Sequence, residues 1–184
     1  MSASVHPASP AQIWTIGHST RSIGEFLSLL AGSHIEMVAD VRSFPGSRKY
    51  PQYGREALAA TLSAHAIDYR WVPALGGRRK ASPNSPNTAW RNASFRGYAD
   101  YMSTTEFAQG LSELLDVSEK ARTALMCSEG VWWRCHRSMI ADALCVRGMQ
   151  VVHILDGKRN AGHPMTSAAQ IVDGALSYAG TKRE

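Results

Sequence analysis

Apolar residues along the chain follow two spacings, and stretches of the two kinds alternate. Short apolar runs occur at 14–17, 35–41, 68–72, 123–127 and 150–155. Runs of this length between polar turn residues are typical of strands buried in a sheet. Between the runs, apolar residues recur three to four positions apart, which predicts helices with one face on that sheet.

Several of the predicted helices have recognisable ends. Ser22 and Glu25 form a capping box before one apolar stripe, and Gly32 follows its last turn. Ser103 and Glu106 have the same spacing before a second stripe. Further helices are expected at about 55–66, 138–146 and 171–178.

This alternation predicts an α/β fold: a single domain with a mainly parallel sheet of about five strands and helices packed on it. We expect residues 12–180 to form the domain and residues 1–11 to be a flexible tail. Residues 73–94 are rich in Gly, Pro, Asn, Ser and Arg, which predicts a long loop of the kind that is often functional.

Composition narrows the class of protein but not its partners. The 184 residues are 44% hydrophobic and 19% charged, which is ordinary for a soluble globular domain. No apolar run approaches the roughly 20 residues of a membrane span, and the first residues do not resemble a signal peptide. Three cysteines argue against a disulfide scaffold, so we expect a cytoplasmic protein. The net charge of +5 comes mostly from arginine, which suits the binding of an acidic partner. A genome whose codons favour arginine would explain the same excess.

Arginine recurs wherever a predicted strand ends. Right-handed crossovers place the loops that follow parallel strands at one edge of the sheet, where ligands of open α/β folds bind. These loops hold more arginines than carboxylates, and two of them lead into helix N-termini, which favour anions. They predict an anion pocket, although any single arginine could instead point to solvent. The arginines are Arg21, Arg42, Arg48, Arg78, Arg79, Arg134, Arg137 and Arg159.

Three other side chains in these loops are candidates for catalysis. Glu129 follows a buried strand and could act as a general acid, a general base or a nucleophile, or could pair with a nearby arginine. His18 could exchange protons or bind the ligand, or could cap a helix together with Ser19. Asp40 and Arg42 form a charged pair at another strand end, where Asp40 could react or organise the pocket.

The cysteines allow more than one interpretation. Cys127, Cys135 and His136 could join His18 in a zinc-like set, but the spacing matches no common zinc motif. Cys127 and Arg134 approximate the layout of cysteine-dependent phosphatases, with one residue too many between them and a glutamate that would repel phosphate. Burial of both cysteines in the core is the plainer alternative.

Aromatic residues are interleaved with the basic loops. Rings beside arginines are the platforms on which nucleobases and single strands stack, although some of these rings are expected to cover the sheet edge instead. They are Phe44, Tyr50, Tyr53, Trp71, Trp90, Phe95, Tyr98, Trp132 and Trp133.

Three segments carry a family resemblance. TIGHSTRS at 15–22, DVRSFPGSRKYPQY at 40–53 and LMCSEGVWWRCHRSMIADAL at 125–144 closely resemble the bacterial and archaeal family labelled domain of unknown function 488. The resemblance spans about 13–154 and implies an α/β domain with a shared site, but no reaction. The signature residues on this chain are His18, Ser19, Asp40, Arg42, Cys127, Glu129, Cys135, His136 and Arg137.

The sequence therefore favours an enzyme that acts on a phosphate-bearing substrate, either a nucleotide or a nucleic acid. We expect Glu129, His18 and Asp40 to be catalytic, through hydrolysis or glycosidic-bond transfer. A non-catalytic nucleic-acid-binding module and a metal-binding protein that uses Cys127 and Cys135 are the alternatives. No cofactor or oligomeric state is predicted. The expected ligand-binding residues are Ser19, Arg21, Arg42, Arg48, Cys127, Arg134, Cys135, His136 and Arg137.

Overall fold

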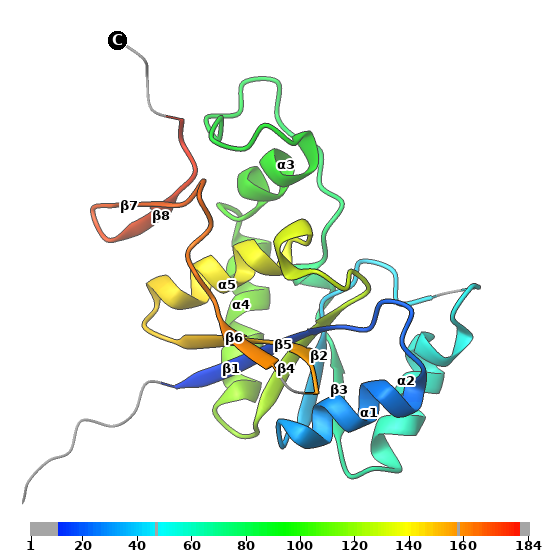
Figure 1. Cartoon of the computed structure of the whole chain (residues 1–184). Helices are drawn as coiled ribbons and strands as arrows, with labels where there is room; N and C mark the ends of the chain where they lie inside the picture. The colour runs from blue at the N-terminus through cyan, green and yellow to red at the C-terminus, as the bar shows by residue number, and fades with distance from the viewer. Residues whose placement is uncertain (1–10, 47, 158, 181–184) are drawn as a thin grey trace, which may run out of the picture.

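A six-stranded sheet forms the middle layer of the fold, with strand order β3-β2-β4-β1-β5-β6 (Figure 1). The computed structural model describes residues 11–46, 48–157 and 159–180. Five strands are parallel, and β6 pairs antiparallel to β5 at one edge. The strands are β1 Gln12–Gly17, β2 Met37–Asp40, β3 Asp68–Trp71, β4 Thr123–Cys127, β5 Gln150–Asp156 and β6 Arg159–Gly162.

Helices cover both faces of the sheet. Alternate residues of a strand point to opposite faces, so Trp14 and Ile16 of β1 pack with α1 and α2, while Ile13 packs with α4 and α5. Tyr98 of α3 joins the core on the α4 and α5 side. The helices are α1 Ile23–Gly32, α2 Arg55–Ser63, α3 Ala93–Tyr101, α4 Thr105–Ser118 and α5 Arg137–Val146. Short 3-10 turns occur at Pro51–Tyr53, Pro73–Leu75 and Trp132–Arg134.

The predicted single α/β sheet with helices on it is confirmed. All five predicted strands are present and parallel, and β6 adds an antiparallel edge strand. The capping box of Ser22 and Glu25 is present at the start of α1. The predicted tail at 1–11 lies, except for Ala11, outside the described residues.

Two local predictions are wrong. Residues 171–178 do not form a helix but a small hairpin of β7 (Gln170–Val172) and β8 (Ala175–Ser177). The turn between these strands is Asp173-Gly174, and both residues have positive φ, as a tight hairpin turn requires. The N-cap of α4 is Thr104, not Ser103, because the Thr104 hydroxyl accepts from the Phe107 N–H.

The order of the strands brings three of their ends together. β4 lies between β2 and β1, and the pairing aligns Gly17 with Cys127 and Asp40 with Met126. The loops that follow β1, β2 and β4 therefore begin side by side at the carboxyl edge of the sheet. An edge where neighbouring strands connect in different directions is the usual ligand site of an open α/β sheet.

The predicted long loop is held by one carboxylate. Asp100 of α3 accepts hydrogen bonds from the Ser82 N–H, the Ser85 hydroxyl and the Asn87 side-chain amide. These bonds oppose burial and lower the pKa of Asp100. The loop thus has a defined course, and its first part, at Gly77 and Arg78, reaches the carboxyl edge of the sheet.

Candidate functional site

A cavity of about 740 Å³ opens at the carboxyl ends of β1, β2 and β4. The loops that follow these strands line it, together with the 76–80 segment and the start of α3. Eight predicted site residues line this cavity: His18, Ser19, Arg42, Cys127, Glu129, Arg134, Cys135 and His136. Asp40 and Arg137 are buried and contact residues of the lining, whereas Arg21 and Arg48 do not line it.

Arg42 forms a buried ion pair with Asp40. The Arg42 Nε donates to both Asp40 oxygens, at 2.9 and 3.1 Å, and its Nη2 donates to Oδ2. The Arg42 main-chain N–H and the Tyr69 hydroxyl also donate to the carboxylate, at 3.1 and 2.7 Å, and burial beside Asp40 raises the pKa of Tyr69. Asp40 is thus fully engaged in holding Arg42, which presents Nη1 to the cavity lining.

His18 is positioned as a neutral imidazole. Its Nδ1 lies 2.9 Å from the Ser19 carbonyl oxygen, which can only accept, so Nδ1 carries the proton. Its Nε2 is therefore unprotonated and faces the Arg42 Nη1 at 3.5 Å. Burial lowers the pKa of His18 to about 4, with the Arg42 charge assisting against the Ser19 bond. The ring stacks on Tyr53 with centroids 4.0 Å apart, which fixes its plane.

Arg137 is almost completely buried, with 1% of its surface exposed, and forms none of the ion pairs found among the described residues. Its Nε donates to the Cys135 sulfur at 3.4 Å, its Nη1 donates to the Thr15 hydroxyl at 3.4 Å, and its Nη2 donates to the Glu129 carbonyl. A buried guanidinium without a carboxylate needs another source of negative charge. The Cys135 sulfur is the contacting atom that can supply it.

The Cys135 thiol is accordingly set to ionise. Burial opposes ionisation, but a hydrogen bond from Cys127 and the charge of Arg137 outweigh it and lower the pKa of Cys135 to about 6. The same bond to Cys135, together with burial, raises the pKa of Cys127, which therefore keeps its proton. Cys135 also lies immediately before the N-terminus of α5, a position that favours a thiolate.

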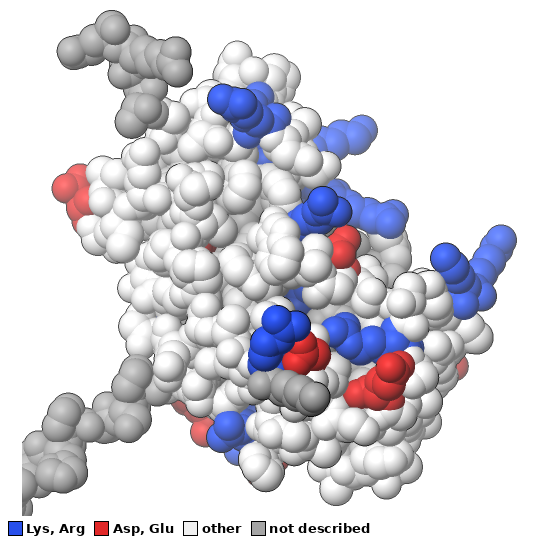
Figure 2. Space-filling view, viewed as in Figure 1, with Lys and Arg blue, Asp and Glu red and all other residues white. Residues whose placement is uncertain are grey.

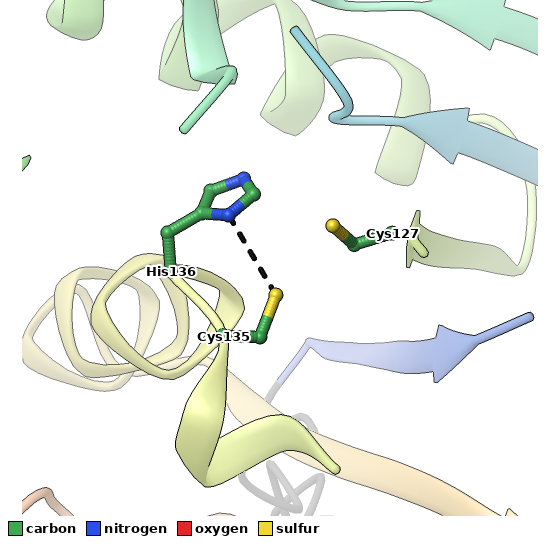
Figure 3. A group of neighbouring side chains, drawn as sticks. All are labelled: Cys127, Cys135 and His136. Carbon is green, nitrogen blue, oxygen red and sulfur yellow. Dashed lines mark hydrogen bonds between the residues drawn. The ribbon is translucent and has the colours of Figure 1, made fainter. Parts of the chain in front are cut away.

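His136 faces the same sulfur. Its Nε2 lies 3.0 Å from the Val41 carbonyl and must donate to it, which leaves Nδ1 unprotonated at 3.6 Å from the Cys135 sulfur. Burial lowers the pKa of His136. Figure 3 shows Cys127 at the end of β4, opposite Cys135 and His136 at the start of α5. The three ligand atoms lie within 4.8 Å of one another, a spacing that could also hold a metal ion.

Glu129 is exposed on the cavity wall, and its carboxylate accepts from the Val131 N–H at 3.3 Å. Its main-chain carbonyl binds Arg137, and a Cβ on Gly17 would lie only 1.9 Å from that oxygen. The end of β1 therefore requires glycine, because the backbones of the two loops are in direct contact.

The predicted convergence of arginines is partial. Arg42, Arg78 and Arg134 line the cavity, and Arg137 lies behind it. Arg21 instead donates to the Gly17 and Leu155 carbonyls, Arg79 stacks on Tyr101, Arg159 pairs with Asp156, and Arg48 is exposed outside the lining. Figure 2 shows the basic side chains of this face as separate groups rather than one continuous patch.

Thr15 and Tyr69 were not predicted as site residues. Thr15 lies on the α5 side of β1 and accepts from Arg137, while Tyr69 of β3 completes the partners of Asp40. A polar residue inside the apolar run of β1 was the signal for Thr15. Tyr69 gave no comparable signal, because it became a partner only through the pairing of β3 with β2.

Comparison with known families gives one match, and it covers most of the chain. The family model described as domain of unknown function DUF488 matches residues 22–144, a range that includes every cavity-lining loop except that of His18 and Ser19. Comparisons with curated proteins and with solved structures gave no match. Among the described residues, no helix combines the length and the apolar character needed to cross a membrane.

Proposed function

The chain belongs to the DUF488 family, and from that premise we propose that it is an enzyme that uses the Cys135 thiolate to attack a phosphate-bearing substrate bound in the cavity. The observation that carries this proposal is the pairing of a buried guanidinium with a sulfur instead of a carboxylate. A thiolate is the nucleophilic form of cysteine, and a guanidinium is the protein group that best matches a phosphate.

The surroundings of Cys135 support a nucleophile. His136 holds an unprotonated Nδ1 3.6 Å from the sulfur and is oriented by the Val41 carbonyl, so it would accept the proton of Cys135 in the fraction that is still a thiol. Cys127 donates to the thiolate and, together with the Arg137 guanidinium, stabilises its charge. Cys135 is also one of the residues that line the cavity, where the substrate would bind.

The anion would be held at the rim. Arg42 presents Nη1 beside His18, and Arg134 and Arg78 are exposed at the lining. In the proposed reaction the sulfur forms a bond to the electrophilic atom, the bond to the leaving group breaks, and water then displaces the sulfur. Glu129 faces the same space and would exchange the leaving-group proton, and neutral His18 would accept a hydrogen bond.

The test uses release of inorganic phosphate from nucleoside mono-, di- and triphosphates and from p-nitrophenyl phosphate. Cys135→Ser should abolish turnover, because a serine hydroxyl is not ionised beside Arg137 at neutral pH. Glu129→Gln should lower turnover at least tenfold with little change in binding. Turnover that survives Cys135→Ser on every substrate hydrolysed by the wild type would overturn the assignment of the nucleophile.

Binding can be tested separately with inorganic phosphate and pyrophosphate by calorimetry. Arg134→Gln should weaken binding, because Arg134 lines the cavity and its side chain is exposed. Arg70→Gln is the matched control, because Arg70 is 55% exposed and pairs with Glu113 away from the cavity. Equal affinity in the two variants would remove Arg134 from the anion site.

A second candidate is a nucleic-acid-binding function, favoured by the aromatic residues at the rim. Phe44 is 71% exposed on the cavity lining with the Arg78 guanidinium 5.8 Å from its ring, and Trp133, which precedes the lining residue Arg134 in the chain, is 54% exposed. Phe44→Ala and Arg78→Gln should then weaken binding of a single-stranded oligonucleotide, and the affinity should fall steeply with salt. A salt-independent affinity would count against this function.

A metal centre at Cys127, Cys135 and His136 is the third candidate, favoured by the spacing of their ligand atoms. The guanidinium of Arg137 already contacts the Cys135 sulfur, and a second cation there would be repelled. Elemental analysis of the purified protein distinguishes the two: a stoichiometric transition metal would favour the metal centre over the free thiolate.

A further inference from the structure

Five polar side chains form a continuous hydrogen-bonded chain behind the cavity. From the Arg137 Nη1, the chain passes to the Thr15 hydroxyl at 3.4 Å and then to His153 at 2.7 Å. From the His153 Nε2 it continues to the His163 Nδ1 at 2.9 Å and ends at the Asp142 carboxylate at 2.9 Å. The five residues come from β1, β5, α5 and the segment after β6.

The direction of the bonds in this chain depends on the protons of His163. Asp142 accepts from the His163 Nε2, and with that single ring proton the His163 Nδ1 accepts from the His153 Nε2. The His153 Nδ1 is then unprotonated and accepts from the Thr15 hydroxyl, whose oxygen accepts from Arg137. In this arrangement both histidines are in the Nε2–H form, and no bond of the chain has two donors.

The side chains of this hydrogen-bonded chain are buried. The His163 and Asp142 side chains have no exposed surface, and His153 is 1% exposed. Asp142 also accepts from the Thr166 N–H, the Thr166 hydroxyl and the Tyr178 hydroxyl, so its position is fixed from three further directions. Trp132 stacks on His153 with centroids 4.3 Å apart and planes 4° apart, which connects the chain to the loop that carries the cavity residues.

We propose that Thr15, His153, His163 and Asp142 are positioning residues that orient the Arg137 guanidinium against the Cys135 sulfur. The Thr15 hydroxyl is bonded both to His153 and to Arg137, so the chain that begins at Asp142 fixes the place of the oxygen that accepts from the Arg137 Nη1. The inference rests on the proposed function, because it assigns these residues a task only if the Cys135 thiolate reacts.

The pH at which Cys135 ionises reports on Arg137 only if no other group near the sulfur changes its charge over the same pH range. The titratable groups that face Arg137 and Cys135 are Cys127 from β4, His136 from α5, His18 after β1, His153 from β5 and Tyr98 from α3. Burial lowers the pKa of His153 to about 3, assisted by His163 and Arg137, so His153 stays neutral where Cys135 titrates.

The experiment is the pH profile of Cys135 alkylation by iodoacetamide, followed for the Cys135 peptide by mass spectrometry in the full-length protein. Thr15→Val keeps the shape of the side chain and removes the hydroxyl. We expect it to raise the pH midpoint of alkylation by about one pH unit, which is a roughly tenfold loss of thiolate below the midpoint. Thr15→Ser restores the hydroxyl and should return the midpoint to the wild-type value.

Thr123→Val is the matched control. Thr123 is equally buried at the start of the neighbouring strand β4, and its hydroxyl donates to the Ala121 carbonyl. It should lose stability without any change in the midpoint. A midpoint that moves equally in Thr15→Val and Thr123→Val, or in neither, overturns the inference.

Two further outcomes separate this inference from the proposed function. If the wild-type alkylation midpoint is lowered and Thr15→Val leaves it unchanged, Thr15 has no positioning role but Cys135 is still a thiolate. If the wild-type midpoint is that of an ordinary cysteine, both the positioning role and the thiolate nucleophile are overturned. Should Thr15→Val fail to fold, long-range ¹H–¹⁵N spectra of the wild type decide. They should show His153 and His163 as neutral Nε2–H imidazoles, and an Nδ1–H form of either would overturn the inference.

Discussion

Two arginines are buried beside the same cavity, and they differ in what balances their charge. Arg42, 6% exposed, meets the Asp40 carboxylate, which lies two residues before it on the same strand end. Arg137, 1% exposed, meets a sulfur, a hydroxyl and a carbonyl. The charges of Arg42 and Asp40 neutralise each other, so this pair needs no further counter-charge. The charge balance of Arg137 depends on the ionisation of Cys135, and this dependence connects the fold to the proposed chemistry.

The largest loss of stability should follow from removing the Asp40 charge from its ion pair with Arg42. Asp40→Asn leaves Arg42 buried without its counter-charge, so the free energy of unfolding should fall by about 3–5 kcal/mol in urea denaturation. Glu113→Gln is the control, because it breaks the exposed pair with Arg70 and should cost less than about 1 kcal/mol. Equal losses would mean that Asp40 does not carry the charge balance of Arg42.

The second effect concerns the pH dependence that Cys135 confers. Its pKa is lowered from 9.0 to about 6 in the folded state, so the unfolded thiol binds its proton first as the pH falls. Stability contributed by the thiolate is complete above about pH 9. It is lost as the pH falls toward 6, by about 1.4 kcal/mol per pH unit between these two values. Denaturation of the wild type and Cys135→Ser across this range should diverge as the pH rises, and parallel curves would mean that Cys135 keeps an ordinary pKa.

A smaller effect is expected from His18 in the acid range. Its pKa is lowered from 6.5 to about 4, so the unfolded state takes up a proton that the folded state refuses. Lowering the pH from 7 to 5 should therefore destabilise the wild type by about 1–2 kcal/mol through this residue. His18→Gln should show a shallower decline over the same range; an unchanged slope would mean that His18 is protonated at its ordinary pKa.

The smallest effect should come from Glu129. Its side chain is exposed, and among the described residues its carboxylate has one hydrogen-bond partner, the Val131 N–H, so Glu129→Gln should change the free energy of unfolding by less than about 0.5 kcal/mol. Thermal and urea denaturation check this value. A large loss would show that the carboxylate supports the fold, and reduced turnover of the variant would then not report on proton transfer.

Periodicity was sufficient to predict the five parallel strands, but β6, whose residues form no apolar run, was not predicted. Periodicity also failed at 171–178, where the Asp173-Gly174 turn signal was outweighed by apolar residues that also fit a helix. The hairpin depends on two positive φ angles, which a helical pattern cannot represent.

The position of the candidate site could be predicted from the sequence better than the roles of its residues. Residues at strand ends could be grouped because parallel strands share an edge, and eight of them line one cavity. The ionisation of Cys135 could not be predicted, because it depends on the distances from its sulfur to Arg137 and Cys127. Likewise, His153 and His163 lie far from the signature motifs in the chain and join the site only through β5 and the segment after β6.

The contact at Gly17 has a mechanical consequence. The backbone at the end of β1 touches the Glu129 carbonyl so closely that no side chain fits between them, and Arg137 clamps the same oxygen. The Glu129 side of the cavity therefore cannot move inward when a ligand binds. Adjustment to the size of a ligand must therefore come from the opposite side of the cavity, where Phe44 and Arg78 are exposed to solvent. On the Glu129 side, the shape that selects a ligand already exists before the ligand binds.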